Sequence, residues 1–228
     1  MRQFWSVSGR DIRIGTCGWS YPSGAGSWTG LFYPPRGRGR RPAGFDELSY
    51  YSEHFDTVEV NTTFYGVPRP EVTAAWARRT PANFEFSVKL FQKFTHPEMF
   101  KAAAQTDDAA LDRADVELFR EAVDPLARAG RLGALLAQFP PSFKNEPRSQ
   151  DHLAWLLDNL VEYPVAVDLR HRSWSDDVRS TVTLLNGVGA AWVQIDEPRF
   201  RFSIAQNYLP NVTSFYNMRL HGHNAAKW

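Results

Sequence analysis

The chain alternates short apolar runs with stretches whose apolar residues recur at helical spacing. A short apolar run between turn residues is typical of a buried strand, and recurrence every three or four residues is typical of an amphipathic helix. Pro70 suits a helix start, and Val72, Ala75 and Trp76 give that helix an apolar face. Pro125 lies inside another helical stretch, which we expect it to kink or divide in two. The predicted strands are residues 12–18, 57–61, 84–90, 132–139, 165–170, 190–196 and 214–221.

This alternation of strands and helices, without a visible internal repeat, predicts an α/β fold with a parallel sheet. A TIM-type (β/α) barrel is favoured over an open doubly wound sheet, because no glycine-rich nucleotide-binding loop follows the first strand. We expect an N-terminal tail over residues 1–11 and a single barrel domain over residues 12–228. The sequence stops just past the seventh strand, so we expect the eighth strand and the final helix of the barrel to be missing from this chain.

Composition narrows the class of protein without naming an activity. The 228 residues are 43% hydrophobic and 22% charged, as in globular domains, and a net charge of +1 gives no global attraction to nucleic acid. Cys17 is the single cysteine, which excludes an internal disulfide and a multi-cysteine metal site. The N-terminus lacks the apolar core of a signal peptide, and no apolar run approaches the length of about 18 residues that a membrane helix needs. We therefore expect a soluble cytoplasmic protein that does not bind membranes; its oligomeric state stays open.

Polar residues gather where the predicted strands end. The clearest case is PVAVDLRHRSW, residues 164–174, in which an apolar strand is followed by Asp168, Arg170 and His171. Alternate side chains of a strand share a face, so Asp168 and Arg170 point one way and His171 points the other. The same alternation places polar groups of six strands on one face near the carboxyl ends, where TIM-barrel active sites are built; a buried hydrogen-bonded layer without activity is the structural alternative. This set comprises Glu59, Asn61, Ser87, Lys89, Gln138, Asp168, Arg170, Gln194, Asp196, Asn217, Arg219 and His221.

Several short motifs together resemble the YecE-like domain of unknown function 72 (DUF72) family. They are RIGTCGWSY, VEVNTTFY, FEFSVKL, QFPPSF, DLRHRSW and MRLHG, and they occur in family order from about residue 12 to residue 228. The resemblance implies a TIM barrel and assigns neither an activity nor a catalytic residue. Asp168 departs from the glutamate that is usual in the family, and family members continue past MRLHG into a last strand.

Three residues at strand ends are candidates for acid/base catalysis. Glu59 and Asp168 carry carboxyl groups, and His221 can titrate near neutral pH. Together with Asp196 these groups could bind a divalent metal, but one lysine and two arginines on the same face offset their charge and favour an anionic substrate. We therefore expect no metal and no redox cofactor. The predicted substrate-binding residues are Trp19, Asn61, Tyr65, Lys89, His96, Gln138, Arg170, His171, Trp174, Asp196 and Arg219.

Residues in the loops have two interpretations each. Trp19, Tyr65 and Trp174 could stack on a sugar or a base, or pack together as a lid. His96 could enter the site or cap a turn. Cys17 is expected to be a small buried thiol rather than a nucleophile, because no base is evident beside it.

The sequence thus predicts a TIM-barrel protein that acts on a phosphate-bearing sugar, a nucleotide or a nucleic acid strand. The expected chemistry is acid/base catalysis, hydrolytic or isomerising, at the carboxyl ends of the strands. The alternative is a non-catalytic protein that binds nucleic acid or a metabolite at the same place.

Overall fold

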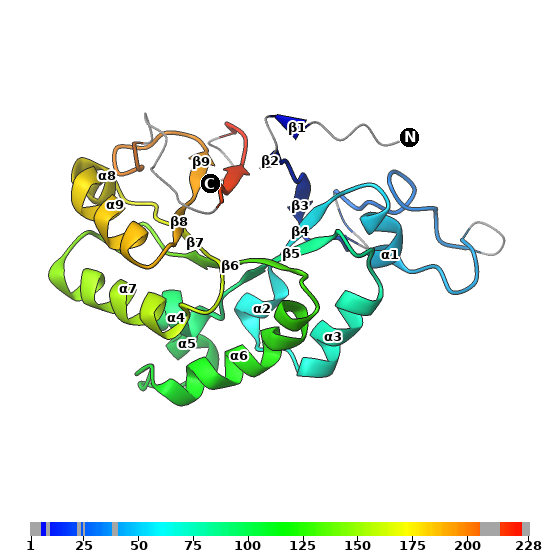
Figure 1. The fold of residues 1–228 in the computed structure, drawn as a ribbon. Helices are drawn as coiled ribbons and strands as arrows, with labels where there is room; N and C mark the ends of the chain where they lie inside the picture. Colours follow the sequence, from blue (N-terminus) through cyan, green and yellow to red (C-terminus); the bar gives the residue numbers. More distant parts are fainter. Residues whose placement is uncertain are drawn as a thin grey trace. The chain divides into compact units, whose positions relative to one another are not determined.

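A computed structural model describes residues 6–7, 10–21, 24, 26–37, 41–205 and 215–224 of this chain (Figure 1). Its central sheet has the strand order β3-β4-β5-β6-β7-β8, and each strand follows the previous one in the sequence. These strands are Gly15–Cys17, Thr57–Val60, Glu85–Lys89, Leu132–Gln138, Val165–Asp168 and Ala191–Trp192. Parallel pairing in chain order is what alternating strands and helices produce, so the predicted α/β class is confirmed.

The sixth predicted strand is observed as two short strands that follow each other along the chain and pair with different neighbours. β8 pairs with β7, and β9 (Gln194–Asp196) pairs in parallel with β10 (Met218–Leu220). Only Val193 separates the two pieces, and its N–H donates to the carbonyl of Val167 over 2.9 Å. All seven predicted strands are therefore present, although Ser214 at the start of the seventh lies outside the described residues.

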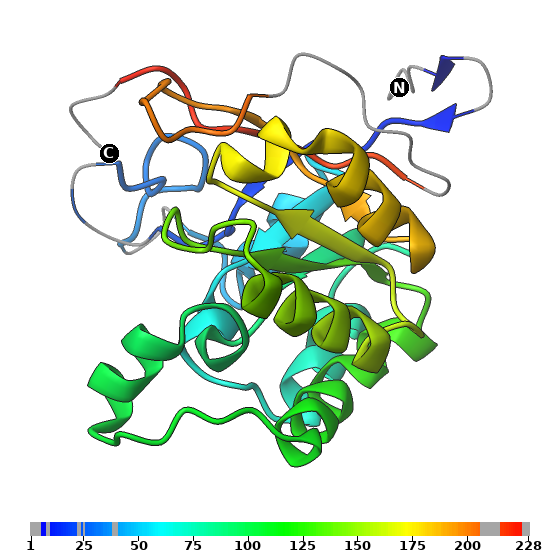
Figure 2. The same ribbon diagram turned by 90° about the vertical axis from the view of Figure 1, so that its left-hand side faces the viewer.

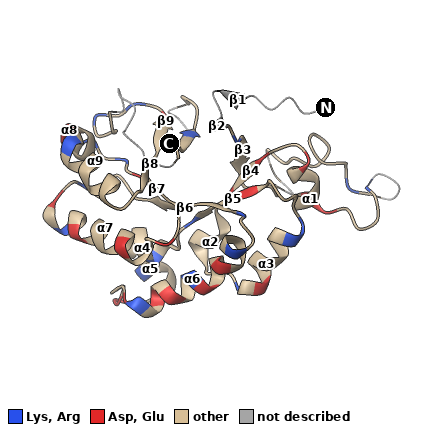
Figure 3. Cartoon of the chain, in the orientation of Figure 1, with Lys and Arg blue, Asp and Glu red and all other residues tan. Residues whose placement is uncertain are grey.

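The helices lie between the strands, as the spacing predicted. The longer helices are α1 (Glu47–Ser52), α3 (Pro70–Arg78), α5 (Pro97–Ala104), α6 (Arg113–Arg128), α7 (Pro147–Asn159) and α9 (Val178–Gly187). Acidic and basic residues are interspersed along α6 and α7, as on the solvent side of amphipathic helices (Figure 3). The sequence analysis missed α5 and also three single-turn helices near strand ends, α2 (Thr62–Tyr65), α4 (Gln92–Thr95) and α8 (Ser173–Asp176).

Two details of the sequence analysis need correction. Pro125 does not divide its helix, because α6 continues to Arg128 and the Pro125 carbonyl still accepts from the N–H of Ala129 over 3.2 Å. In addition, the predicted N-terminal tail contains two short strands, β1 (Ser6–Val7) and β2 (Arg10–Asp11), which pair antiparallel.

The chain contains two compact units. The first consists of residues 1–61, 68–88 and 121–133, and the second of residues 62–67, 89–120 and 134–228. In the second unit β6 and β7 run side by side, as the turned view in Figure 2 shows. One face of these strands is apolar, with Ala134, Leu136, Ala166 and Val193 packed together. This apolar layer ends at Gln138 and Asp168, the polar residues at the carboxyl ends of β6 and β7.

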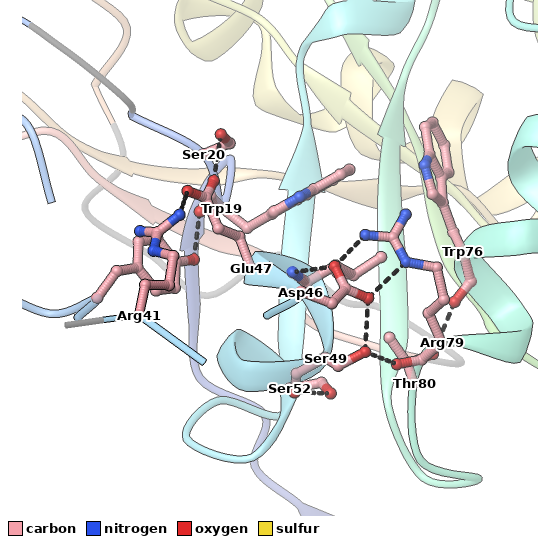
Figure 4. Close-up of polar contacts among 12 residues, drawn as sticks. Trp19, Ser20, Arg41, Asp46, Glu47, Ser49, Ser52, Trp76, Arg79 and Thr80 are labelled. Carbon is pink, nitrogen blue, oxygen red and sulfur yellow. Dashed lines mark hydrogen bonds and ion pairs between the residues drawn. The ribbon is translucent and has the colours of Figure 1, made fainter. Parts of the chain in front are cut away.

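In the first unit the long loop after β3 is fastened to the start of α1 (Figure 4). Asp46 caps α1 by accepting from the N–H of Leu48, and Arg79 donates to the same carboxylate. This pairing with Arg79 lowers the pKa of Asp46 to about 2. Glu47 holds the loop by accepting from Ser20 Oγ over 2.6 Å and from Arg41 Nη1 over 3.1 Å. The loop residue Trp19 packs edge-on against Trp76 of α3, with 5.6 Å between ring centroids.

Gly15 begins β3 at a point where no side chain fits. A Cβ on Gly15 would lie 1.9 Å from the carbonyl oxygen of Thr57, its partner in the parallel pair. Backbone atoms of a paired strand cannot move away as a flexible side chain can.

We expect Gly15→Ala to lower the free energy of unfolding by about 3 kcal/mol or more, because the clash forces β3 and β4 apart. Gly66→Ala is the matched control, since a Cβ there meets nothing within 4 Å. Urea unfolding followed by tryptophan fluorescence measures both variants. Equal stabilities of the two variants would contradict the packing described for β3.

Candidate functional site

Polar side chains of the second unit converge at the carboxyl ends of β6, β7 and β10. Gln138 and Asp168 are register partners, so their side chains leave the sheet on the same face. Arg219 of β10 reaches them both, donating from Nη1 to Gln138 Oε1 over 3.0 Å and to Asp168 Oδ2. The predicted grouping of Gln138, Asp168, Arg170 and Arg219 is therefore observed.

Asp168 is the centre of this cluster and is 0% exposed. Arg170 binds its carboxylate with both Nε, at 2.6 Å, and Nη2, at 2.8 Å, while Arg219 donates to the same group. A buried carboxylate needs such charged donors because it has lost its water. The two guanidinium groups thus surround Asp168, and we refer to these three residues as the Asp168 cluster.

The alternation predicted for the sixth strand was wrong by one residue. Ala166 pairs with Ala191, which places Val193, Ile195 and Glu197 on the face of Asp168 and turns Gln194 and Asp196 to the other face. The apolar core decides this register, because Val193 and Ile195 pack with the apolar residues of β6 and β7. Asp196 instead lies 2.9 Å from the ring Nε2 of the exposed His223. Asp196 is therefore not a neighbour of Asp168, contrary to the prediction.

Glu197 takes the place that was assigned to Asp196. Its carboxylate accepts from Arg170 Nη1, which joins it to the Asp168 cluster. Burial raises the pKa of Glu197, and the nearby Arg170 opposes this effect. A carboxyl group with a raised pKa can exchange protons closer to neutral pH. Counting alternate positions from Val193 and Ile195 would have identified Glu197 from the sequence.

His221 contacts the cluster through Arg170. Its Nε2 lies 3.2 Å from Arg170 Nη2. A guanidinium group can only donate, so Nε2 accepts the hydrogen bond and the imidazole carries its proton on Nδ1. His221 is therefore joined to the Asp168 cluster as an acceptor for Arg170.

Lys89 and His96 form the next part of the site. The ammonium group of Lys89 lies 4.3 Å from the centroid of the Phe64 ring, and the imidazole of His96 contacts the same ring edge-on at 5.0 Å. His96 Nδ1 is 2.8 Å from the hydroxyl of Thr95. Burial and the charge of Lys89 lower the pKa of His96 to about 4, against a smaller opposite effect of Asp168. His96 is thus neutral at pH 7 and lies within electrostatic reach of both Lys89 and Asp168.

The first unit contains its own polar group, formed by Cys17, Glu59 and Asn61. The thiol of Cys17 donates to Glu59 Oε1 over 3.0 Å, and Asn61 Nδ2 donates to the sulfur over 2.6 Å. Cys17 is exposed, so the prediction of a buried thiol was wrong, and a carboxylate does lie beside it. The shared face of Glu59 and Ser87 is as predicted, because they are register partners of β4 and β5. Burial and the charges of Cys17 and Glu59 raise the pKa of Tyr21.

Two other predicted substrate-binding residues lie away from the Asp168 cluster. Trp174 is fully buried, stacks on Phe143 at 5.5 Å and donates from Nε1 to the Phe143 carbonyl, so it is a core residue and cannot stack on a ligand. His171 leaves β7 on the other face from Arg170 and contacts Ser173 through Nδ1. Burial and Lys144 lower its pKa.

An open cleft of about 390 Å³ lies between α7 and α9 and is distinct from the strand ends. It is lined by Ala154, Trp155, Leu157, Asp158, Leu184 and Val188, a mostly apolar set. In the part of the chain that the structure describes, no group of three or more histidine, cysteine, aspartate and glutamate side chains could hold a metal ion. Nor does any described helix have the length and apolar character that crossing a membrane requires.

Comparison with known proteins identifies the family. The model of the family described as "Protein of unknown function DUF72" matches residues 13–228. This chain belongs to the DUF72 family. The resemblance found in the short motifs is thereby confirmed.

Relatives of this DUF72 protein carry names that state no activity. It is 26% identical over 224 residues to UPF0759 protein YunF of Bacillus subtilis (strain 168), which covers 95% of this chain and 72% of YunF. It is 31% identical over 178 residues to UPF0759 protein YecE of Escherichia coli (strain K12), which covers 78% of this chain and 55% of YecE. The match thus spans only about half the length of YecE.

Two crystal structures of DUF72 family proteins share the fold. One, from Enterococcus faecalis V583, has a TM-score of 0.73 at 26% identity and covers 95% of this chain and 72% of its own. The other, from Thermotoga maritima MSB8, has a TM-score of 0.68 at 31% identity and covers 93% of this chain and 75% of its own. These likenesses support the predicted fold class for the DUF72 chain.

The pairing of Asp168 predicts a large effect on stability. Asp168→Asn leaves two buried guanidinium groups without their common counter-ion, which we expect to lower the free energy of unfolding by about 3–5 kcal/mol. The matched control Asp196→Asn removes an exposed carboxylate and should change stability by less than about 0.5 kcal/mol. Urea unfolding measures both, and an Asp168→Asn variant as stable as the wild type would disprove the role described for this carboxylate.

The lowered pKa of His96 predicts a dependence of stability on pH. Between pH 6.5 and about 4 the unfolded chain binds a proton at His96 that the folded protein does not, so folding stability is lost as the pH falls. From pH 7 to pH 5 the loss due to this partly buried ring should be about 1–2 kcal/mol. His96→Gln should remove that share of the loss, and the exposed control His54→Gln should keep it. Urea unfolding at both pH values measures the difference, and identical pH dependence in all three proteins would refute it.

Proposed function

We propose that this DUF72 protein is an acid/base enzyme, hydrolytic or isomerising, whose substrate carries a phosphate group. The phosphate would bind at the strand ends of the second unit. The substrate class remains that predicted from sequence: a sugar phosphate, a nucleotide or a nucleic acid strand. A cytoplasmic location belongs to the same proposal and agrees with a single cysteine, which cannot form an internal disulfide.

The kind of donor that gathers here supports this proposal most directly. Three cations, those of Lys89, Arg170 and Arg219, lie at the strand ends of the second unit: both arginines bind Asp168, and Lys89 and Asp168 both act on the pKa of His96. Arginine and lysine donors suit the oxygens of phosphate.

The arrangement of the arginines supports a fixed binding geometry. Each guanidinium group is held by Asp168 and by a second acceptor, Glu197 for Arg170 and Gln138 for Arg219. Donors that are already oriented need not reorganise when negative charge develops on a substrate. We assign Asp168 the role of positioning the arginines, because its carboxylate is fully buried and already accepts hydrogen bonds from both guanidinium groups.

Proton transfer is assigned to Glu197, with His221 as a second candidate. Glu197 is on the substrate side of Arg170 in this proposal, and burial raises its pKa toward the range in which a carboxyl group can act as a general acid. His221 stays a candidate because its contact with Arg170 joins it to the Asp168 cluster. Glu59 keeps its candidacy as an acid or base within the first unit, beside Cys17.

A binding protein without turnover is the second candidate function. The completeness of the Asp168 pairing favours it, since a fully satisfied buried network can serve recognition alone. Both candidates require the anion to bind at the same strand ends, and they differ in whether the ligand is altered.

Inorganic phosphate is the probe that tests the site. We expect calorimetry to show binding that weakens as ionic strength rises, and at least about fivefold weaker binding by Lys89→Met, because the substitution removes the cation beside His96. Lys101→Met, which changes a lysine paired with Glu98 on α5, should bind as the wild type does. Absence of phosphate binding, or equal binding by both variants, would refute the site.

Turnover is the second readout of the same experiment. Phosphorus NMR of a panel of sugar phosphates and nucleotides incubated with the protein reports whether any ligand is altered. For an altered ligand, Glu197→Gln should abolish turnover and leave its binding within about twofold. Ligands that bind and stay unaltered across the panel would instead select the binding protein.

A further inference from the structure

The short helix α2 is fastened to the end of β5 at the edge of the phosphate site. The hydroxyl of Thr63 donates to the carbonyl of Lys89 over 2.6 Å. The next residue, Phe64, is 4% exposed, and its ring contacts both the Lys89 ammonium group and the His96 ring. A single-turn helix has little stability of its own, so these contacts fix its position relative to Lys89 and His96.

Tyr65 ends this helix and is 71% exposed. Its ring meets the ring of Phe64 at an interplanar angle of 87°, with 5.1 Å between centroids. Most of the Tyr65 ring surface is therefore open to solvent while its backbone is held by the contacts of Thr63 and Phe64. The buried ring of Phe64 therefore contacts the exposed Tyr65 ring, the cation and the neutral imidazole.

This combination matches a ligand with two different ends. An aromatic surface takes a planar ring, because stacking is favourable for any base whatever its edge groups. A lysine ammonium group and a neutral imidazole suit a phosphate oxygen. In a nucleotide the base and the phosphate are joined by one ribose, so one ligand can engage both features. A sugar phosphate lacks the planar ring and would leave Tyr65 without a role.

We propose that the phosphate-bearing ligand is a nucleotide whose base stacks on Tyr65 while its phosphate binds beside Lys89 and His96. Tyr65 is then a specificity residue of the second unit. This inference rests on the proposed function, since it uses the same phosphate site, and it narrows the three substrate classes to one.

Three probes that share a phosphate group separate the base from the rest of the ligand. They are adenosine monophosphate, ribose 5-phosphate and inorganic phosphate, each titrated by calorimetry into the full chain. We expect the wild type to bind the nucleotide at least about tenfold more tightly than ribose 5-phosphate, as stacking of one base predicts. Tyr65→Ala and Tyr65→Leu should lose this advantage, and Tyr65→Phe should keep it, because only phenylalanine retains an aromatic ring.

Inorganic phosphate serves as the internal control. Its affinity should be the same in the wild type and in all three Tyr65 variants, which also shows that the variants are folded. If phosphate binds but the nucleotide binds no more tightly than ribose 5-phosphate, or keeps its advantage in Tyr65→Ala, the nucleotide assignment is overturned and the phosphate site stands. If phosphate itself does not bind the wild type, the proposed function fails and the nucleotide assignment fails with it.

Discussion

The burial of one carboxylate, that of Asp168, organises the strand ends of the second unit. A carboxylate without water is unstable unless strong donors replace its solvent shell, and here Arg170 and Arg219 do so. Each arginine then needs acceptors for its remaining N–H groups, and Gln138 and Glu197 provide them. The need to pair this one buried charge therefore accounts for polar residues at the ends of β6, β9 and β10. The apolar layer of Ala134, Leu136, Ala166 and Val193 below it excludes water and makes the pairing obligatory.

The same constraint separates residues that fix geometry from residues that are suited to chemistry. Both carboxylate oxygens of Asp168 accept hydrogen bonds from the arginines, so its charge is paired within the protein. Glu197 has a raised pKa, and His96 has a lowered one. Shifts in opposite directions from ordinary values are typical of groups whose surroundings disfavour charge, and such groups are common where substrates bind. The three paired residues of the Asp168 cluster thus differ in kind from Glu197 and His96, whose pKa values are shifted.

Much of this arrangement could be predicted from the sequence, because strand alternation and apolar runs are local signals. The faces of Glu59, Lys89, Gln138, Asp168 and Arg219 followed from counting along single strands. The sixth strand failed because both of its faces carry a plausible alternation, and only packing of Val193 and Ile195 against neighbouring strands selects one. The exposed Cys17 beside Glu59 was not predictable, since that contact joins residues 42 positions apart. Trp174 was misassigned because a loop position near the site says nothing about burial.

The contacts of Arg219 also bear on how the chain folds during synthesis. Arg219 donates to Asp168, which lies 51 positions earlier, and to Gln138, which lies 81 positions earlier. On the ribosome the β6 and β7 segments therefore emerge well before the cation that completes the neutralisation of Asp168. Until the β10 segment has been synthesised, Asp168 lacks one of the two guanidinium groups that bind it in the folded protein. The native contacts at this end of β6 and β7 can therefore be complete only after the segment that contains Arg219 has emerged.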